Sequence, residues 1–218
     1  MEKKKYNFSE ITYKILKKII NIKQVRNRKI FKNWSDFKFE INKYDEEFLL
    51  NLIKANEYNI DFYMENQLFG HFINPLLNRV YFYGENYREW FQAEIYGTIN
   101  GNIFKGKADF LVASGDLEPI NPFFFLREFK KQKTDSEPLM QLIAEMVVAI
   151  EINKSKKMLG AYNIGRLWYF VILEKISNNK YQFHESESFN SCKIEELKQI
   201  YKNLHYIKHK IINNFVKN

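Results

Sequence analysis

The segment 123–130, with the sequence FFFLREFK, constrains the fold more than any other part of the chain. It is an apolar run of strand length, which is typical of a strand buried on both faces. A strand of that kind needs a sheet with helices packed on both sides. Before it, the dipeptide Asn100–Gly101 is a strong hairpin signal and joins predicted strands at 91–99 and 102–113.

An amphipathic helix is predicted after this strand, ending near Asn153. Its N-terminal caps are expected among Thr134, Asp135 and Ser136, with Pro138 in the first turn. The side chains expected to face inward are Leu139, Leu142, Ile143, Met146 and Ile150. The strand, the helix and a further strand at 159–162 are long enough together for a right-handed crossover between parallel strands.

The other elements follow from hydrophobic periodicity. Helices are predicted at 45–55, at 63–80 with an interruption at Pro75, and at 193–215; further strands are predicted at 167–174 and 181–185. Because helices precede a hairpin, a strand, a helix and more strands, the sequence predicts an α/β fold. Its central β-sheet is expected to be mixed and flanked by helices.

Positive charge is concentrated at the N-terminus. Residues 1–34 hold eleven Lys or Arg and two Glu, while the whole chain has 34 basic and 26 acidic residues. Ile11, Ile15, Ile19 and Ile22 have helical spacing, so residues 1–60 are expected to form a basic helical extension. Such a segment suits a nucleic-acid backbone or an anionic membrane surface, and nucleic acid is favoured.

The composition also limits the setting of the protein. The single cysteine, Cys192, cannot form an internal disulfide, and no apolar run approaches the roughly 20 residues of a transmembrane helix. No apolar stretch typical of a secretory signal follows the basic start. The expected location is the cytoplasm, with no transmembrane segment.

Three charged residues are the candidates for metal binding and catalysis. Asp109 lies in the second arm of the hairpin, and Glu128 and Lys130 project from one face of the next strand. Two charges on a buried strand are costly unless they are paired or bound to a metal. If the strands are neighbours, Asp109 and Glu128 can chelate Mg²⁺ or Mn²⁺, and Lys130 can orient the attacking water. Arg127, on the other face, is expected to pair with an acid.

The order Asp109, then Glu128-Phe129-Lys130, resembles the PD-(D/E)xK nuclease superfamily, with Ala108 where the family usually has Pro. The resemblance implies a restriction-endonuclease-like core (αβββαβ) within residues 61–218, followed by a C-terminal amphipathic helix. It also implies a supporting metal ligand, for which Glu65 is the best match. A polar Gln is common on the following helix, where Gln141 and Glu145 share a face.

The resemblance implies a Mg²⁺-dependent nuclease, an endonuclease more than an exonuclease, with nucleic acid, most of all DNA, as its partner. A defence or restriction role follows by analogy only, and cutting both strands would favour a homodimer.

Several alternatives stay open. The same three residues could form a structural ion pair, Glu57 and Glu89 are rivals of Glu65, and Gln141 and Glu145 could lie on an exposed helix face. An inactive module could bind nucleic acid or a protein partner without cutting, and the last helix could mediate assembly.

Overall fold

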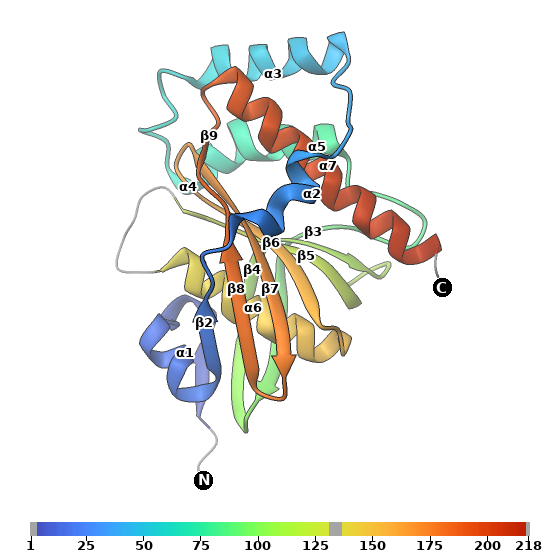
Figure 1. Ribbon diagram of the computed structural model, residues 1–218. Coiled ribbons are helices and arrows are strands. Elements are labelled where there is room, and N and C mark those ends of the chain that lie inside the picture. The colour runs from blue at the N-terminus through green and yellow to red at the C-terminus, as the bar shows by residue number, and fades with distance from the viewer. Residues whose placement is uncertain (1–3, 131–136, 217–218) are drawn as a thin grey trace.

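The computed structural model, which describes residues 4–130 and 137–216, contains a nine-stranded mixed sheet with helices on both faces (Figure 1). The strands follow the order β1-β4-β5-β6-β7-β8-β2, while β3 pairs with β4 and β9 pairs with β7. Their bounds are β1 Lys5–Asn7, β2 Asn21–Gln24, β3 Arg88–Ile99, β4 Asn102–Ser114, β5 Ile120–Lys130, β6 Lys157–Ile164, β7 Leu167–Ser177, β8 Lys180–Glu185 and β9 Phe189–Asn190.

Seven α-helices accompany this sheet in the described residues. Their bounds are α1 Tyr13–Ile19, α2 Lys32–Ser35, α3 Lys43–Asn56, α4 Glu65–Leu68, α5 Asn74–Val80, α6 Pro138–Asn153 and α7 Ile194–Val216. Short 3-10 turns occupy Phe8–Glu10 (η1) and Arg28–Phe31 (η2). The predicted helix at 63–80 is three segments in succession, because the π-turn Phe69–Ile73 (η3) lies between α4 and α5. Pro75 lies just after this turn and lacks the N–H that a regular helix would use.

The predicted mixed α/β fold is confirmed. β5 and β6 are parallel and are joined by α6, whereas β3, β4 and β5 form an antiparallel meander. The predicted turn joins β3 to β4, and both Asn100 and Gly101 have positive φ, at 48° and 78°. The predicted helix caps at 134–136 lie outside the described residues.

Two helical layers enclose the sheet. α6 packs on one face, and α2, α3, α5 and α7 pack on the other, where they lie above the sheet in Figure 1. Each layer buries its own apolar core, so β5 between them is covered on both faces, as its sequence predicts. None of the described helices is long and apolar enough to cross a membrane.

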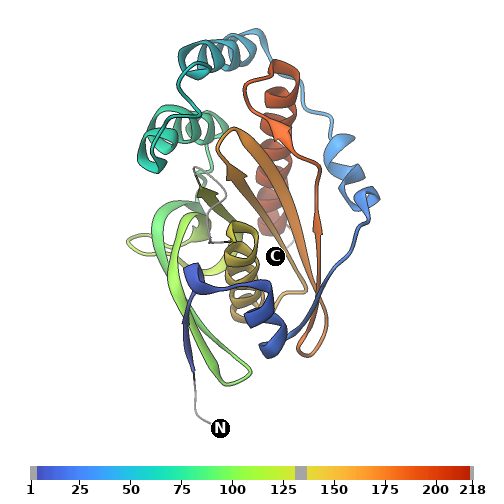
Figure 2. The ribbon, with the colours of Figure 1, turned by 90° about the vertical axis from the view of Figure 1, so that its left-hand side faces the viewer.

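The N-terminal segment with isoleucines at helical spacing is only partly helical. Only Tyr13–Ile19 is α-helical within residues 5–24, and Ile22 lies on a strand. β1 pairs with β4 and β2 pairs with β8, so this segment, the N-terminal strap, connects both halves of the sheet across α6 (Figure 2). It therefore covers the outer side of α6, whose residues are buried all round from Met140 to Ile150.

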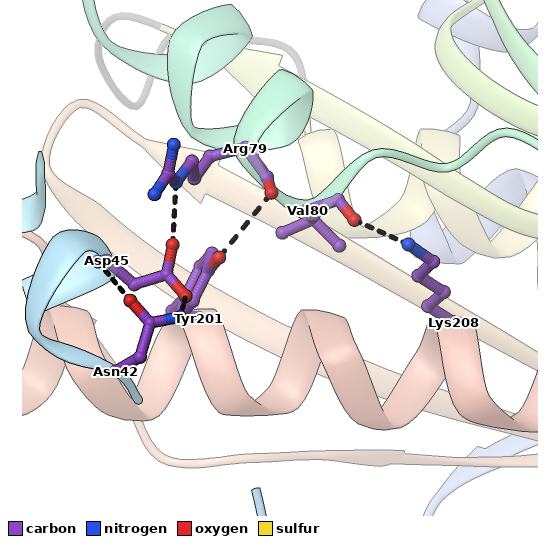
Figure 3. Close-up of polar contacts among 6 residues, drawn as sticks. All are labelled: Asn42, Asp45, Arg79, Val80, Tyr201 and Lys208. Atoms are coloured by element: carbon purple, nitrogen blue, oxygen red, sulfur yellow. Dashed lines mark hydrogen bonds and ion pairs between the residues drawn. The ribbon is translucent and has the colours of Figure 1, made fainter. Parts of the chain in front are cut away.

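A polar network fastens the helices of the second layer to one another (Figure 3). Arg79 Nε of α5 donates to Asp45 Oδ1 of α3 at 2.6 Å, and Asn42 Nδ2 donates to Asp45 Oδ2 at 2.7 Å. Two donors from α7 reach the last carbonyls of α5: the Tyr201 hydroxyl bonds to Arg79 O at 3.4 Å, and Lys208 Nζ to Val80 O at 2.9 Å. The last turn of α5 is therefore capped by another helix.

Asp45→Ala should lower the free energy of unfolding by about 2 kcal/mol, because it removes a buried charged acceptor shared by Arg79 and Asn42. Urea denaturation measures this loss. Glu47→Ala, an exposed acid in the same helix, is the matched control and should change the free energy little. Equal midpoints for both variants would contradict a stabilising role for the network.

Candidate metal centre

The β3–β4 hairpin bends sharply where Asp109 lies. The strand pairing passes from Phe91–Phe110 to Ala93–Ala108, and Gln92 between them has a φ of 51°. Phe110 belongs to the core under α7, whereas Ala93 and Ala108 belong to the core under α6. The side chains therefore change faces at this point, although the register of the two strands is the same on both sides.

The bend directs the Asp109 carboxylate toward the end of β5. Its Oδ1 accepts from Gln92 Nε2 at 2.9 Å, and its Oδ2 accepts from the backbone N–H of Phe129 at 3.0 Å. Asp109 thus links the bend in β3 to the strand that carries Glu128 and Lys130. β4 and β5 are neighbours in the sheet, which is the condition under which Asp109 and Glu128 can share a site.

Glu128 is buried completely and faces the carboxyl groups of Asp109 and Glu145. Neither of its oxygens accepts from an N–H donor in the described part of the chain, and the groups within hydrogen-bonding reach are the carboxyl groups of Asp109 and Glu145. α6 supplies the opposite wall, where Gln141 Nε2 donates to Glu145 Oε1 at 3.3 Å and Glu145 is also fully buried. A buried carboxylate without donors is costly, so this arrangement favours either a proton or a cation at Glu128.

The electrostatics of the cluster agree with that geometry. Burial raises the pKa of Glu128 well above its usual value, and the charges of Glu145 and Asp109 raise it further. Burial also raises the pKa of Glu145 to about 8, although its contacts with Glu128 and Gln141 and the charge of Lys130 act in the opposite direction. A divalent cation among these oxygens would stabilise their ionised forms.

Lys130 and Glu65 lie at the edge of this cluster. Lys130 Nζ is 3.9 Å from Glu65 Oε1, in the first turn of α4, and the lysine side chain is mostly buried. The five predicted residues, Asp109, Glu128, Lys130, Gln141 and Glu65, are therefore gathered around the end of β5, with Glu65 in contact through Lys130. The rivals of Glu65 lie elsewhere, since Glu57 is near Cys192 and Glu89 near Lys208.

Arg127 projects to the opposite face of β5, as predicted, but it forms no ion pair with an acid among the described residues. Its Nη2 donates to the side-chain oxygen of Asn163, and its guanidinium carbon lies 4.2 Å from the centre of the Trp168 ring. Burial lowers the pKa of Arg127 to about 9, while the charges of Asp109 and Glu128 raise it. The acids across the sheet thus partly offset the cost of burying the Arg127 charge.

Asn163 extends this contact to Lys130. Its Nδ2 donates to Gly165 O at 2.8 Å, and the Gly165 N–H donates to Lys130 O at 2.8 Å. The β6–β7 turn therefore holds the backbone of the last residue of β5. Sequence reasoning missed Asn163 and Gln92, for which no local pattern exists, and treated Glu145 only as the partner of Gln141.

The donor set fits a hard cation. Within the described residues, no three His, Cys, Asp or Glu side chains are positioned to hold a metal by themselves. Mg²⁺ does not require such a cage, because it keeps several waters and is often bound through one or two carboxylates and substrate phosphates. Asp109 and Glu128 could supply those carboxylates, and oxygen donors suit Mg²⁺ or Mn²⁺.

No protein-family model matches this chain, and no curated protein matches its sequence significantly.

Proposed function

We propose that this protein is a Mg²⁺-dependent nuclease with a restriction-endonuclease-like core of the PD-(D/E)xK type. The observation that carries the proposal is Glu128, a fully buried acid that no N–H donor of the described residues reaches and that lies against two further acids beside a lysine. The element order supports it, since α4–α5, β3, β4, β5, α6 and β6 follow the αβββαβ order of that core.

Each residue has a role in this proposal. Asp109 and Glu128 hold the cation, and Gln141 orients Glu145 beside them. The bound cation, Mg²⁺ or Mn²⁺, would polarise the scissile phosphate and lower the pKa of its water. Lys130 orients that water and stabilises negative charge on the phosphate in the transition state. Glu65 restrains the Lys130 ammonium, and in this proposal it supplies a further oxygen to the metal shell.

Nucleic acid, with DNA favoured, is the proposed substrate. The described basic residues of the N-terminal segment, among them Lys14, Lys17, Lys18 and Lys23, are exposed. Tyr13 N–H, at the start of α1, donates to Glu137 Oε2 at the start of α6, so the strap reaches the helix that carries Gln141 and Glu145. Exposed lysines on such a strap can bind phosphates through counterion release.

The test is cleavage of supercoiled plasmid and of single-stranded DNA and RNA with Mg²⁺ or Mn²⁺. We expect the wild type to nick plasmid, which has no ends and so requires an endonuclease, and Lys130→Ala to lose at least 100-fold in rate, on the order of one lost transition-state contact. Lys38→Ala is the matched control, because Lys38 is exposed and is distant from Lys130 in the sequence, and this variant should cut normally.

Inert wild-type protein on every substrate, combined with no Mn²⁺ binding in calorimetry, would refute the nuclease proposal. Binding of nucleic acid without cleavage would then support the alternative of a catalytically inactive module with the same fold.

A further inference from the structure

Three large apolar side chains are exposed on the 57–64 loop, which connects α3 to α4. Tyr58, Phe62 and Met64 are 81%, 78% and 64% exposed. Single exposed hydrophobic residues are common, but three within seven residues are a feature that needs a reason.

Buried contacts and hydrogen bonds hold this loop in place, so the exposure of its apolar side chains is not the result of loose packing. Ile60 is buried in the core of the α7 layer, and Asp61 Oδ1 accepts from Arg166 Nε at 2.8 Å. The Tyr63 hydroxyl donates to Asn56 Oδ1 at 2.9 Å, and Asn56 is itself buried and bonded to Leu52 O. Residues 60, 61 and 63 are thus anchored, while Phe62 is exposed between two of these anchors and Met64 is exposed directly after the last.

The anchored loop adjoins the candidate metal centre from two directions. Met64 immediately precedes Glu65, which lies 3.9 Å from Lys130 Nζ. Arg166, which holds Asp61, follows Gly165, whose N–H binds Lys130 O at 2.8 Å. Phe62 is three residues from Glu65, a reach of at most about 10 Å, or about three nucleotides of a stacked strand at 3.4 Å each.

We propose that Phe62 and Met64 form a base-stacking subsite for a single-stranded segment of nucleic acid whose phosphate enters the metal centre. This proposal rests on the nuclease function, and it names the substrate class as strands with unstacked bases. Apolar wedges of Phe and Met separate stacked bases in other proteins, and aromatic rings bind bases of any sequence. Two apolar side chains offer too little area for a stable protein interface. Beside a site that binds phosphate, such a pair matches the size of a base.

The experiment measures the affinity of labelled single-stranded oligonucleotides by fluorescence anisotropy. All proteins carry Lys130→Ala, so that the strand stays intact. Phe62→Ala/Met64→Ala should weaken binding of the single strand about tenfold, the effect of losing one base stack. Tyr44→Ala, whose ring is 76% exposed on α3, is the matched control and should bind normally.

A second set of strands carries one abasic position, moved along the sequence. At the position that contacts Phe62, removal of the base should weaken binding by the protein that carries only Lys130→Ala. It should not weaken binding by the Phe62→Ala/Met64→Ala variant, because the effects of removing two groups in contact on the binding free energy are not additive. Unchanged affinity in the double variant, or no binding of any strand, would overturn the proposal. Stacking without cleavage by the wild type would overturn the nuclease function and leave the subsite standing.

Discussion

Glu128→Gln is expected to raise the thermal stability of the metal-free protein at pH 8 and to abolish binding of Mg²⁺ or Mn²⁺. Burial and the neighbouring Glu145 and Asp109 hold the pKa of Glu128 well above its usual range. The folded protein therefore keeps a proton there at pH values at which the unfolded chain has already lost it. Glutamine has a similar shape and carries no charge, so it removes this requirement, and the same change removes a metal ligand.

The sign of the pH dependence follows from linkage. A carboxyl whose pKa is higher in the folded state stabilises the protein fully below the unfolded pKa, and this stability is lost as the pH rises through the folded pKa. For Glu145 the window runs from about 4.5 to about 8, and the pKa of Glu128 is raised in the same direction. The metal-free wild type should therefore lose stability between pH 5 and pH 8.

Differential scanning fluorimetry in EDTA, at pH 5 and at pH 8, measures both effects. A tenfold difference in a proton-binding constant between the folded and unfolded states corresponds to about 1.4 kcal/mol, so Glu128→Gln should raise Tm by about 5 °C at pH 8 and by much less at pH 5. Mn²⁺ should raise the Tm of the wild type but not that of the variant. Glu118→Gln, an exposed glutamate, serves as control. A variant that Mn²⁺ stabilises as strongly as the wild type would exclude Glu128 as a ligand.

The parts of the site that sequence predicts well are those that depend on local periodicity. Glu128 and Lys130 share a face because strand side chains alternate, and Gln141 and Glu145 share one because they are four residues apart on a helix. The apolar character of residues 123–130 was enough to predict a strand covered on both sides. The prediction that Asp109 shares a site with Glu128 depended on one condition, that its strand is a neighbour of β5. The sequence left this condition open, and the pairing of β4 with β5 meets it.

The parts that sequence missed depend on contacts between distant residues. Ile11, Ile15, Ile19 and Ile22 fit a helix, but β1 and β2 find strand partners more than ninety residues away in β4 and β8. The backbone of the strap therefore uses its hydrogen bonds on the sheet, and tertiary pairing overrides the local pattern. No sequence pattern around Gln92 indicates that it adopts a positive φ. No pattern around Arg127 indicates that its hydrogen-bond partner is the side-chain amide of Asn163.

Asn163→Ala should destabilise the protein by about 3 kcal/mol, because it removes a buried hydrogen-bond partner from a buried charge. Asn163 accepts from Arg127, whose Nε and Nη1 already lack partners among the described residues. Without Asn163 the guanidinium keeps its contacts with the Trp168 and Phe129 rings and the attraction of the acids across the sheet. The variant also releases Gly165 O, and with it the turn that holds Lys130.

Urea denaturation of three variants separates these contributions. Asn163→Asp keeps an acceptor for Arg127 but loses the donor to Gly165, so it should retain more stability than alanine while still disturbing Lys130. Asn51→Ala, an exposed asparagine on α3, should be nearly neutral. If Asn163→Ala and Asn51→Ala unfold at the same urea concentration, the two aromatic rings and the acid cluster stabilise Arg127 without the amide. If the aspartate variant is stable but slow in cleavage, the turn acts on Lys130 and not only on the fold.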